Sequence, residues 1–198
     1  MAAIVTGCLA FCLFILYEFN NTYWHRPSLR PFFTIACVLL ILATGKLAFF
    51  TAPTFALPLW ARIGSGAGAV VFGFLLVYSL FFALPFQETY IEQPTENELY
   101  DKGVYALCRH PGVLWFIFFY FCLWLFSGVS GMLPAWLLFS LFNVAYIWLQ
   151  DYKLFPIQFS GYGEYRKTTP FLIPTTASVR RCVATLPRKH HLGKGGSI

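Results

Sequence analysis

The longest uncharged stretch of the chain reads RHPGVLWFIFFYFCLWLFSGVSGMLPAWLLFSLFNVAYIWLQD and runs from Arg109 to Asp151. Between these two ends lie 41 residues without a single Asp, Glu, Lys or Arg. A membrane-crossing helix needs about 20 apolar residues, so this stretch is long enough for two. The turn-forming sequence SGVSG at 127–131 interrupts it near the middle. The pattern predicts a helical hairpin, with helices at about 111–126 and 132–149.

The composition of the whole chain agrees with a membrane location. Of its 198 residues, 58% are hydrophobic and only 11% are charged. Soluble globular domains carry roughly 25% charged residues. The composition therefore excludes an ordinary soluble protein and a disordered chain. The six cysteines form no C-x-x-C pair and lie mostly in apolar runs, so we expect them to be small apolar side chains rather than disulfides or metal ligands.

Three further apolar runs, at 2–19, 32–50 and 63–86, are long enough to cross a membrane. Together with the hairpin they predict an all-α integral membrane protein with about five transmembrane helices. The third run is rich in glycine at positions 64, 66, 68 and 73, a pattern that lets helix backbones approach closely. A nucleotide-binding loop is disfavoured there, because no strand precedes these glycines and no Lys-Ser/Thr pair follows them.

The positive charges predict the orientation of the chain in the membrane. Eight of the 14 Lys and Arg residues follow position 150, and the formal net charge is +6. With the C-terminus in the cytoplasm, Lys46 and Arg62 are the only two of the 14 basic residues on the opposite side, as the positive-inside rule requires. We therefore expect a multi-pass protein of a bacterial inner membrane or the endoplasmic reticulum, with a cytoplasmic tail near anionic lipid and no nucleic-acid partner. No Lys or Arg precedes the first run, which favours a retained helix over a cleaved signal peptide.

The hairpin brings two polar sequences together at its open end. Arg109 and His110 precede Pro111, which suits the first position of a helix, and helix N-termini favour anions. Gln150 and Asp151 end the second helix, where a carboxylate is unfavourable unless a cation accompanies it. A site with both a cationic and an anionic side suits a zwitterion such as S-adenosylmethionine. The alternative is a set of interfacial charges that only anchor the helix ends.

These residues also form part of a longer pattern. It comprises Leu99, Gly103, Tyr105, Arg109, His110 and Pro111, followed by Gln150, Asp151, Leu154, Phe159, Gly161, Tyr162, Tyr165, Pro170 and Pro174. The pattern resembles the signature of the isoprenylcysteine carboxyl methyltransferase and phospholipid methyltransferase superfamily. The chain departs from that signature at Val113, Trp115 and Gln150, where the family usually has Tyr, Gly and Glu.

The resemblance implies a methyltransferase that uses S-adenosylmethionine and methylates a lipid-like or prenylated small molecule, such as an isoprenylcysteine. It assigns the chemistry to Arg109 and Asp151, and it places no metal in the site. The cofactor-binding residues that it implies are Tyr105, Arg109, His110, Gln150, Asp151, Tyr162 and Tyr165.

The resemblance also implies a division of the chain into three parts. Residues 1–90 form the acceptor side, residues 91–175 form the cofactor-binding half with the hairpin at 111–149, and residues 176–198 form a basic flexible tail. The cofactor-binding part is then cytoplasmic, and Trp115 lies where it shapes the acceptor tunnel. Glu164 and Arg166 are expected to be ordinary surface residues.

Two other functions stay open. A non-catalytic membrane scaffold is favoured by the departures at Val113, Trp115 and Gln150. An NADPH-dependent membrane reductase is disfavoured, because the Asn-Tyr-x-Gly-Glu sequence typical of such enzymes is absent. The oligomeric state is left open.

Overall fold

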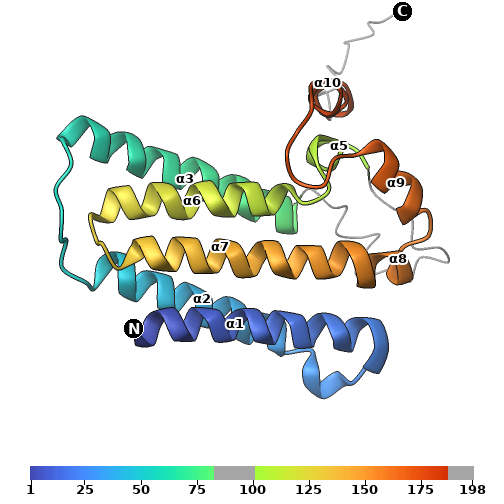
Figure 1. The fold of residues 1–198 in the computed structure, drawn as a ribbon, viewed down its shortest axis with the longest axis horizontal. Coiled ribbons are helices and arrows are strands. Elements are labelled where there is room, and N and C mark those ends of the chain that lie inside the picture. The colour runs from blue at the N-terminus through green and yellow to red at the C-terminus, as the bar shows by residue number, and fades with distance from the viewer. Residues whose placement is uncertain (83–100, 187–198) are drawn as a thin grey trace, which may run out of the picture.

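The computed structural model describes residues 1–82 and 101–186, and all regular structure in these residues is helical (Figure 1). Two of the helices continue at their C-terminal ends into a π-helical turn, named η1 and η3. The elements in chain order are α1 (Ala2–Phe19), η1 (Asn20–Trp24), the short 3-10 turn η2 (Pro27–Leu29), α2 (Phe32–Phe49), α3 (Leu59–Phe81), α5 (Val104–Leu107), α6 (Pro111–Ser127), α7 (Met132–Leu149), η3 (Gln150–Leu154), α8 (Phe155–Gln158), α9 (Tyr162–Thr168) and α10 (Thr176–Thr185).

Four helical segments are long and apolar enough to cross a membrane. They are Ala2–Trp24, Pro27–Phe49, Leu59–Phe81 and Met132–Gln158. The fifth expected span corresponds to α6, which is apolar but has only 17 residues. The described part of the chain is therefore compatible with a multi-pass membrane protein and has four such segments, rather than the expected five.

Several helix boundaries coincide with proline and glycine residues of the sequence. The hairpin helices α6 and α7 begin at Pro111 and Met132, as predicted, and Gly128 ends α6 in a left-handed conformation with φ of 68°. The third apolar run begins earlier than expected, because Pro58 caps α3 directly before Leu59. The expected end of this run at 86 lies outside the described residues.

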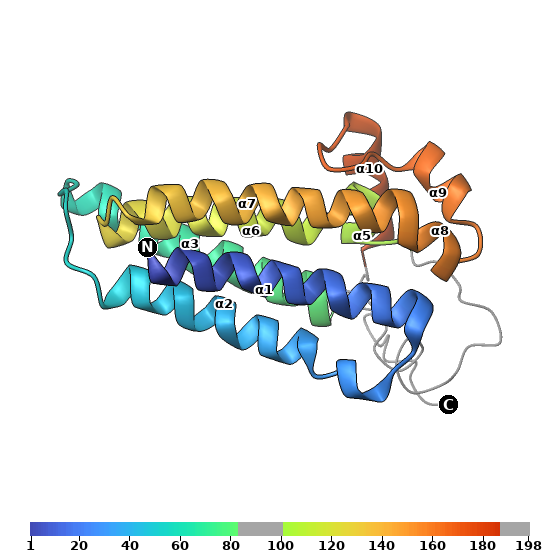
Figure 2. The ribbon, with the colours of Figure 1, turned by 60° about the horizontal axis from the view of Figure 1, so that its bottom comes forward.

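The five long helices form one bundle, in which α6 and α7 run antiparallel beside each other (Figures 1 and 2). Helix α3 packs along α6, while α1 packs against both α7 and α2. The indole of Trp136 donates a hydrogen bond of 3.0 Å to the carbonyl of Ile117, which ties α7 to α6. Aromatic side chains from three of the helices, including Phe11, Phe116 and Phe139, fill the centre.

The glycine-rich face of α3 lies against α6, as the sequence predicts. A methyl group added at Gly66, Gly68 or Gly73 would press against side chains of α6. Gly64 faces open space instead. Three of the four glycines therefore permit the close approach of α3 to α6.

The tight packing of α1 on α7 yields a first prediction. A Cβ atom at Gly7 would overlap the ring of Phe139, which is fully buried and packs against the rings of Phe11 and Tyr120. Gly7→Ala is therefore expected to destabilise the protein by about 1–3 kcal/mol, the usual effect of overpacking. Gly64→Ala is the control, since its added methyl group meets nothing within 4 Å. Equal midpoints of thermal unfolding for the two variants, measured in detergent, would contradict this packing.

Candidate functional site

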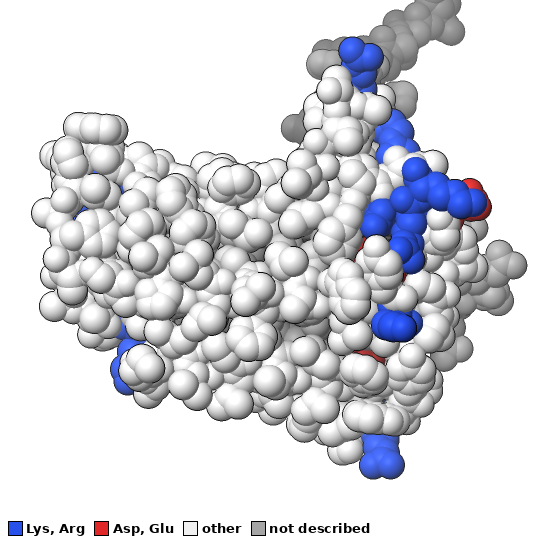
Figure 3. Space-filling model, in the orientation of Figure 1, with Lys and Arg blue, Asp and Glu red and all other residues white. Residues whose placement is uncertain are grey.

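The charged side chains gather at one end of the bundle. In Figure 3, Lys and Arg cover the end that carries α9 and α10, whereas the flank of the long helices is almost uncharged. Lys46 lies in the last turn of α2 and Arg62 in the first turn of α3, at the opposite end. The charge asymmetry expected from the sequence is therefore present across the two ends of the molecule.

The ends of the hairpin helices bring the predicted site residues together. His110 precedes Pro111 with φ of −127° and ψ of 61°, outside the α region that a following proline disfavours. Helix α7 passes into the π-helical turn η3, which carries Gln150 and Asp151. Such turns are frequent at functional sites, since the extra residue redirects the side chains that follow.

The Asp151 carboxylate is the centre of the site. It is fully buried and accepts hydrogen bonds from Arg109 Nε at 2.7 Å and from Arg109 Nη2 at 3.0 Å. Tyr162 donates its hydroxyl to the same carboxylate at 2.6 Å, and His110 Nε2 lies 3.2 Å from it. The carboxylate thus has the cation that its place at a helix C-terminus requires. We name Arg109, His110, Asp151, Tyr162 and Arg166 the Asp151 cluster.

Arg109 also joins the site to the C-terminal segment. Its Nη1 donates to the carbonyls of Arg166 at 3.1 Å and Thr169 at 2.7 Å, and its backbone N–H donates to Pro170 at 2.9 Å. Phe171 covers the guanidinium at 5.5 Å. One arginine therefore holds the start of α6, the end of α7 and the chain after α9 in a fixed arrangement.

Burial sets the protonation of the neighbours of Asp151. It lowers the pKa of His110, although the nearby Asp151 acts in the opposite direction, so the imidazole is neutral near pH 7. Burial raises the pKa of Tyr162, and the negative charge of Asp151 raises it further. Tyr162 therefore stays protonated, and its hydroxyl donates a hydrogen bond to the carboxylate.

Arg166 belongs to the cluster, although the sequence analysis assigned it to the surface. Its Nε lies 3.5 Å from Asp151 Oδ2, and its guanidinium covers the ring of Tyr152 at 4.3 Å. The side chain keeps 30% of its surface exposed. The signal in the sequence was its position four residues after Tyr162, which places both on one face of a helix.

Gln150 belongs to a second group of hydrogen-bonded side chains, which it forms with Glu18 and Tyr146. Its amide donates to the carboxylate of Glu18 at 2.8 Å, and Tyr146 donates to the same oxygen at 2.9 Å. Sequence reasoning missed this contact. The signal was that Glu18 is the one charged residue of the first apolar run.

The remaining predicted residues lie near the cluster without touching Asp151. The Tyr165 hydroxyl donates to the backbone carbonyl of Tyr105 at 2.7 Å, and the Tyr105 hydroxyl donates to that of Ser79 at 2.8 Å. The Trp115 ring stacks on Phe72 at 6.2 Å. Leu99 lies outside the described residues. Among the residues that are described, no group of His, Cys, Asp or Glu has the arrangement of a metal site.

Comparisons with protein-family models, with curated proteins and with solved structures found no match. The class of protein is therefore described from its fold and its site alone. The described chain is an all-helical bundle compatible with a multi-pass membrane protein, with a buried carboxylate–arginine cluster at one end.

The hydroxyl of Tyr162 is expected to stabilise the fold measurably. Tyr162→Phe removes one donor from a buried carboxylate, and hydrogen bonds to charged groups contribute about 1.5–3 kcal/mol. Tyr152→Phe is the matched control, since Tyr152 is 49% exposed and the substituted ring still lies under Arg166. The free energy of unfolding in detergent measures both. Losses of the same size would show that Tyr162 adds nothing specific to the cluster.

Acidification is expected to destabilise the protein through His110. Burial lowers the pKa of this imidazole in the folded chain, whereas its ordinary value in the unfolded chain is about 6.5. Below about pH 6.5 the unfolded chain binds a proton that the folded chain does not, so this contribution is complete above that pH and falls as the pH decreases. The midpoint of thermal unfolding, measured from about pH 7 to about pH 5, should therefore decrease.

A pair of histidine variants isolates this effect. His110→Asn should flatten the pH dependence of the unfolding midpoint, because the titrating group is gone. His25→Asn should keep the wild-type slope, since His25 is exposed and Asn tolerates its left-handed backbone with φ of 52°. The same slope in wild type and in His110→Asn would refute the assignment.

Proposed function

We propose that this chain is a membrane methyltransferase that uses S-adenosylmethionine and methylates a lipid-like or prenylated acceptor. One observation carries the proposal. Arg109-His110 and Asp151, the two separated parts of the sequence pattern, meet with Tyr162 around one buried carboxylate. The proposal places this end of the bundle, with the C-terminal segment, on the cytoplasmic side, in agreement with its positive charge.

The charges of the cluster suit the carboxylate end of the cofactor. Two guanidinium groups, Arg109 and Arg166, face the single carboxylate of Asp151, which leaves an excess positive charge. Arg166 is the available partner for a ligand carboxylate, because its side chain is partly exposed. Its Nε also lies farther from the Asp151 carboxylate, at 3.5 Å, than the Nε of Arg109, at 2.7 Å. Arginine is well suited to this role because its planar guanidinium binds a carboxylate through two parallel hydrogen bonds.

Asp151 has a different role in this proposal from the one the sequence suggested. Its oxygens already accept bonds from Arg109 and Tyr162 and contact His110, so they are engaged within the protein. Asp151 therefore positions Arg109 and Tyr162 rather than binding the ammonium group of the cofactor. Gln150 similarly fixes η3 against α1 through Glu18.

The chemistry makes modest demands on the protein. The bound cofactor supplies a methyl group already activated by its positively charged sulfur. The chain has to hold donor and acceptor in contact and exclude water. The buried, hydrogen-bonded cluster provides a rigid wall for such a site, and the apolar helices give an acceptor access from the bilayer.

A second candidate is a membrane protein that has the fold without catalysis. The observation in its favour is that Asp151 is completely buried and fully hydrogen-bonded within the protein. Such an arrangement is expected of a residue that only holds the helix ends together. The departures at Val113, Trp115 and Gln150 favour the same function.

Ligand titration separates these functions. The full chain, purified in detergent, is titrated with S-adenosylmethionine and separately with NADPH. We expect saturable binding of S-adenosylmethionine alone. Binding of NADPH instead would indicate a reductase, and binding of neither would support the non-catalytic function.

Two neighbouring basic residues provide a matched pair of variants. Arg166→Ala should weaken binding of S-adenosylmethionine about tenfold, the effect of losing roughly 1.4 kcal/mol. The Arg109–Asp151 pair stays intact in this variant. Lys167→Ala removes an exposed charge that pairs with Glu164 and should leave the affinity unchanged. Equal affinities of the two variants would remove Arg166 from the proposed site.

A further inference from the structure

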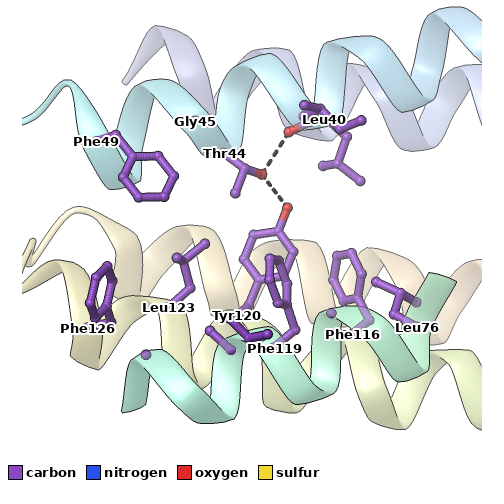
Figure 4. Close-up of a pocket in the computed structure, with 15 residues that line it drawn as sticks. Leu40, Thr44, Gly45, Phe49, Leu76, Phe116, Phe119, Tyr120, Leu123 and Phe126 are labelled. Carbon is purple, nitrogen blue, oxygen red and sulfur yellow. Dashed lines mark hydrogen bonds between the residues drawn. The ribbon is translucent and has the colours of Figure 1, made fainter. Parts of the chain in front are cut away.

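A cavity of about 750 Å³ lies between α2, α3 and α6 (Figure 4), and its lining reaches Phe49 and Phe126 at the ends of α2 and α6 that lie away from the charged end. Its floor is formed by buried side chains of α6, including Phe116, Tyr120 and Leu123. The lining residues Ile41 on α2 and Val70 on α3 keep 68% and 73% of their surface exposed. The cavity is therefore a groove that opens between α2 and α3, both long enough to cross a membrane.

Small residues create the space in this groove. Gly45, Gly66, Ala69 and Gly73 line it, and none of them has a side chain larger than a methyl group. A Cβ atom at Gly45 would meet nothing within 4 Å, so this side of α2 faces empty space. A groove of this size is within the range that binds small molecules.

The one hydrogen-bonded pair in the groove has a defined direction. Thr44 donates its hydroxyl hydrogen to the carbonyl of Leu40 at 2.7 Å. Tyr120 and Thr44 are hydrogen-bonded to each other, and Tyr120 must be the donor because the hydrogen of Thr44 is already used. Both hydrogens therefore point toward the backbone carbonyl of Leu40. Figure 4 draws the two hydrogen bonds as dashed lines between the three residues. The Tyr120 oxygen keeps the capacity to accept one bond and has no hydrogen left to donate.

We propose that this groove binds an apolar molecule from the bilayer that carries a hydroxyl group, which it donates to the oxygen of Tyr120. The lining contains no charged residue, and the groove opens between two helices that are long and apolar enough to cross a membrane, so its chemistry suits an apolar ligand. The hydrogen-bond direction adds the selectivity, since an alcohol has a hydrogen to donate and an ether or ester of the same shape has none. This inference does not depend on the proposed methyltransferase activity.

The site is tested with a matched pair of probes. Radiolabelled lauryl alcohol is bound to the full chain in phosphatidylcholine nanodiscs, and unlabelled lauryl alcohol or its methyl ether competes with it. We expect the alcohol to compete about tenfold better than the ether, the effect of one hydrogen bond in an apolar site. Equal competition by the two probes would overturn the proposal.

Two glycine variants test the location. Gly45→Leu places a bulky side chain in the groove at a position where its Cβ atom meets nothing within 4 Å, and it should lower the affinity for the alcohol at least tenfold. Gly64→Leu adds the same side chain on α3 outside the groove, where its Cβ atom also meets nothing within 4 Å, and this variant should bind the alcohol normally. Wild-type binding by Gly45→Leu would show that the alcohol binds elsewhere.

Variants of the polar pair test the direction of the hydrogen bond. Tyr120→Phe should lose the preference for alcohol over ether. Thr44→Val frees the hydrogen of Tyr120, so the ether should gain affinity about tenfold and approach the alcohol. If Thr44→Val retains the wild-type preference, the pair serves only to tie α2 to α6, and the proposal is wrong. Thermal unfolding in the same nanodiscs verifies that each variant is folded.

Discussion

The ion pair between Arg109 and Asp151 is the interaction on which the charged end of the molecule depends. Both groups are buried, and a buried charge without its partner is strongly destabilising. The pair joins Arg109, two residues before α6, to the turn after α7, so it closes the open end of the hairpin. Through two backbone carbonyls it also fixes the chain that follows α9. The position of Tyr162 and Arg166 therefore depends on the same pair.

The structure separates two kinds of chemistry along the bundle. The charged end offers a buried carboxylate, a neutral imidazole and a partly exposed arginine, which suit a small anionic or zwitterionic molecule. The uncharged half of the bundle offers a groove with no charged lining residue, in which the oxygen of Tyr120 can accept a hydrogen bond. Helix α6 connects them, since Pro111 begins it beside Asp151 and Tyr120 lies on the floor of the groove. About ten residues of this helix, roughly 15 Å, lie between the two sites.

Much of the fold could be predicted from local signals. Pro111 and the turn-forming sequence at 127–131 define the hairpin, and the hairpin by itself brings Arg109 near Asp151. The contacts of Arg166 and Gln150 could not be predicted in the same way. They depend on the path of the chain through η3 and α9, where a π-helical turn and a left-handed Gly161 redirect the side chains. The full hydrogen bonding of Asp151 is likewise a property of the folded arrangement, because its four partners come from two separate segments, residues 109–110 and α9.

A double-mutant cycle on Arg109 and Asp151 tests the central claim most directly. The free energy of unfolding is measured in detergent for wild type, Arg109→Met, Asp151→Leu and the double variant. The account predicts that each single variant loses about 3–5 kcal/mol, because each removes one partner of a buried ion pair, and that the double variant loses far less than the sum. Losses that add to within about 0.5 kcal/mol would show that the two residues act independently, and that the charged end is held together by other contacts.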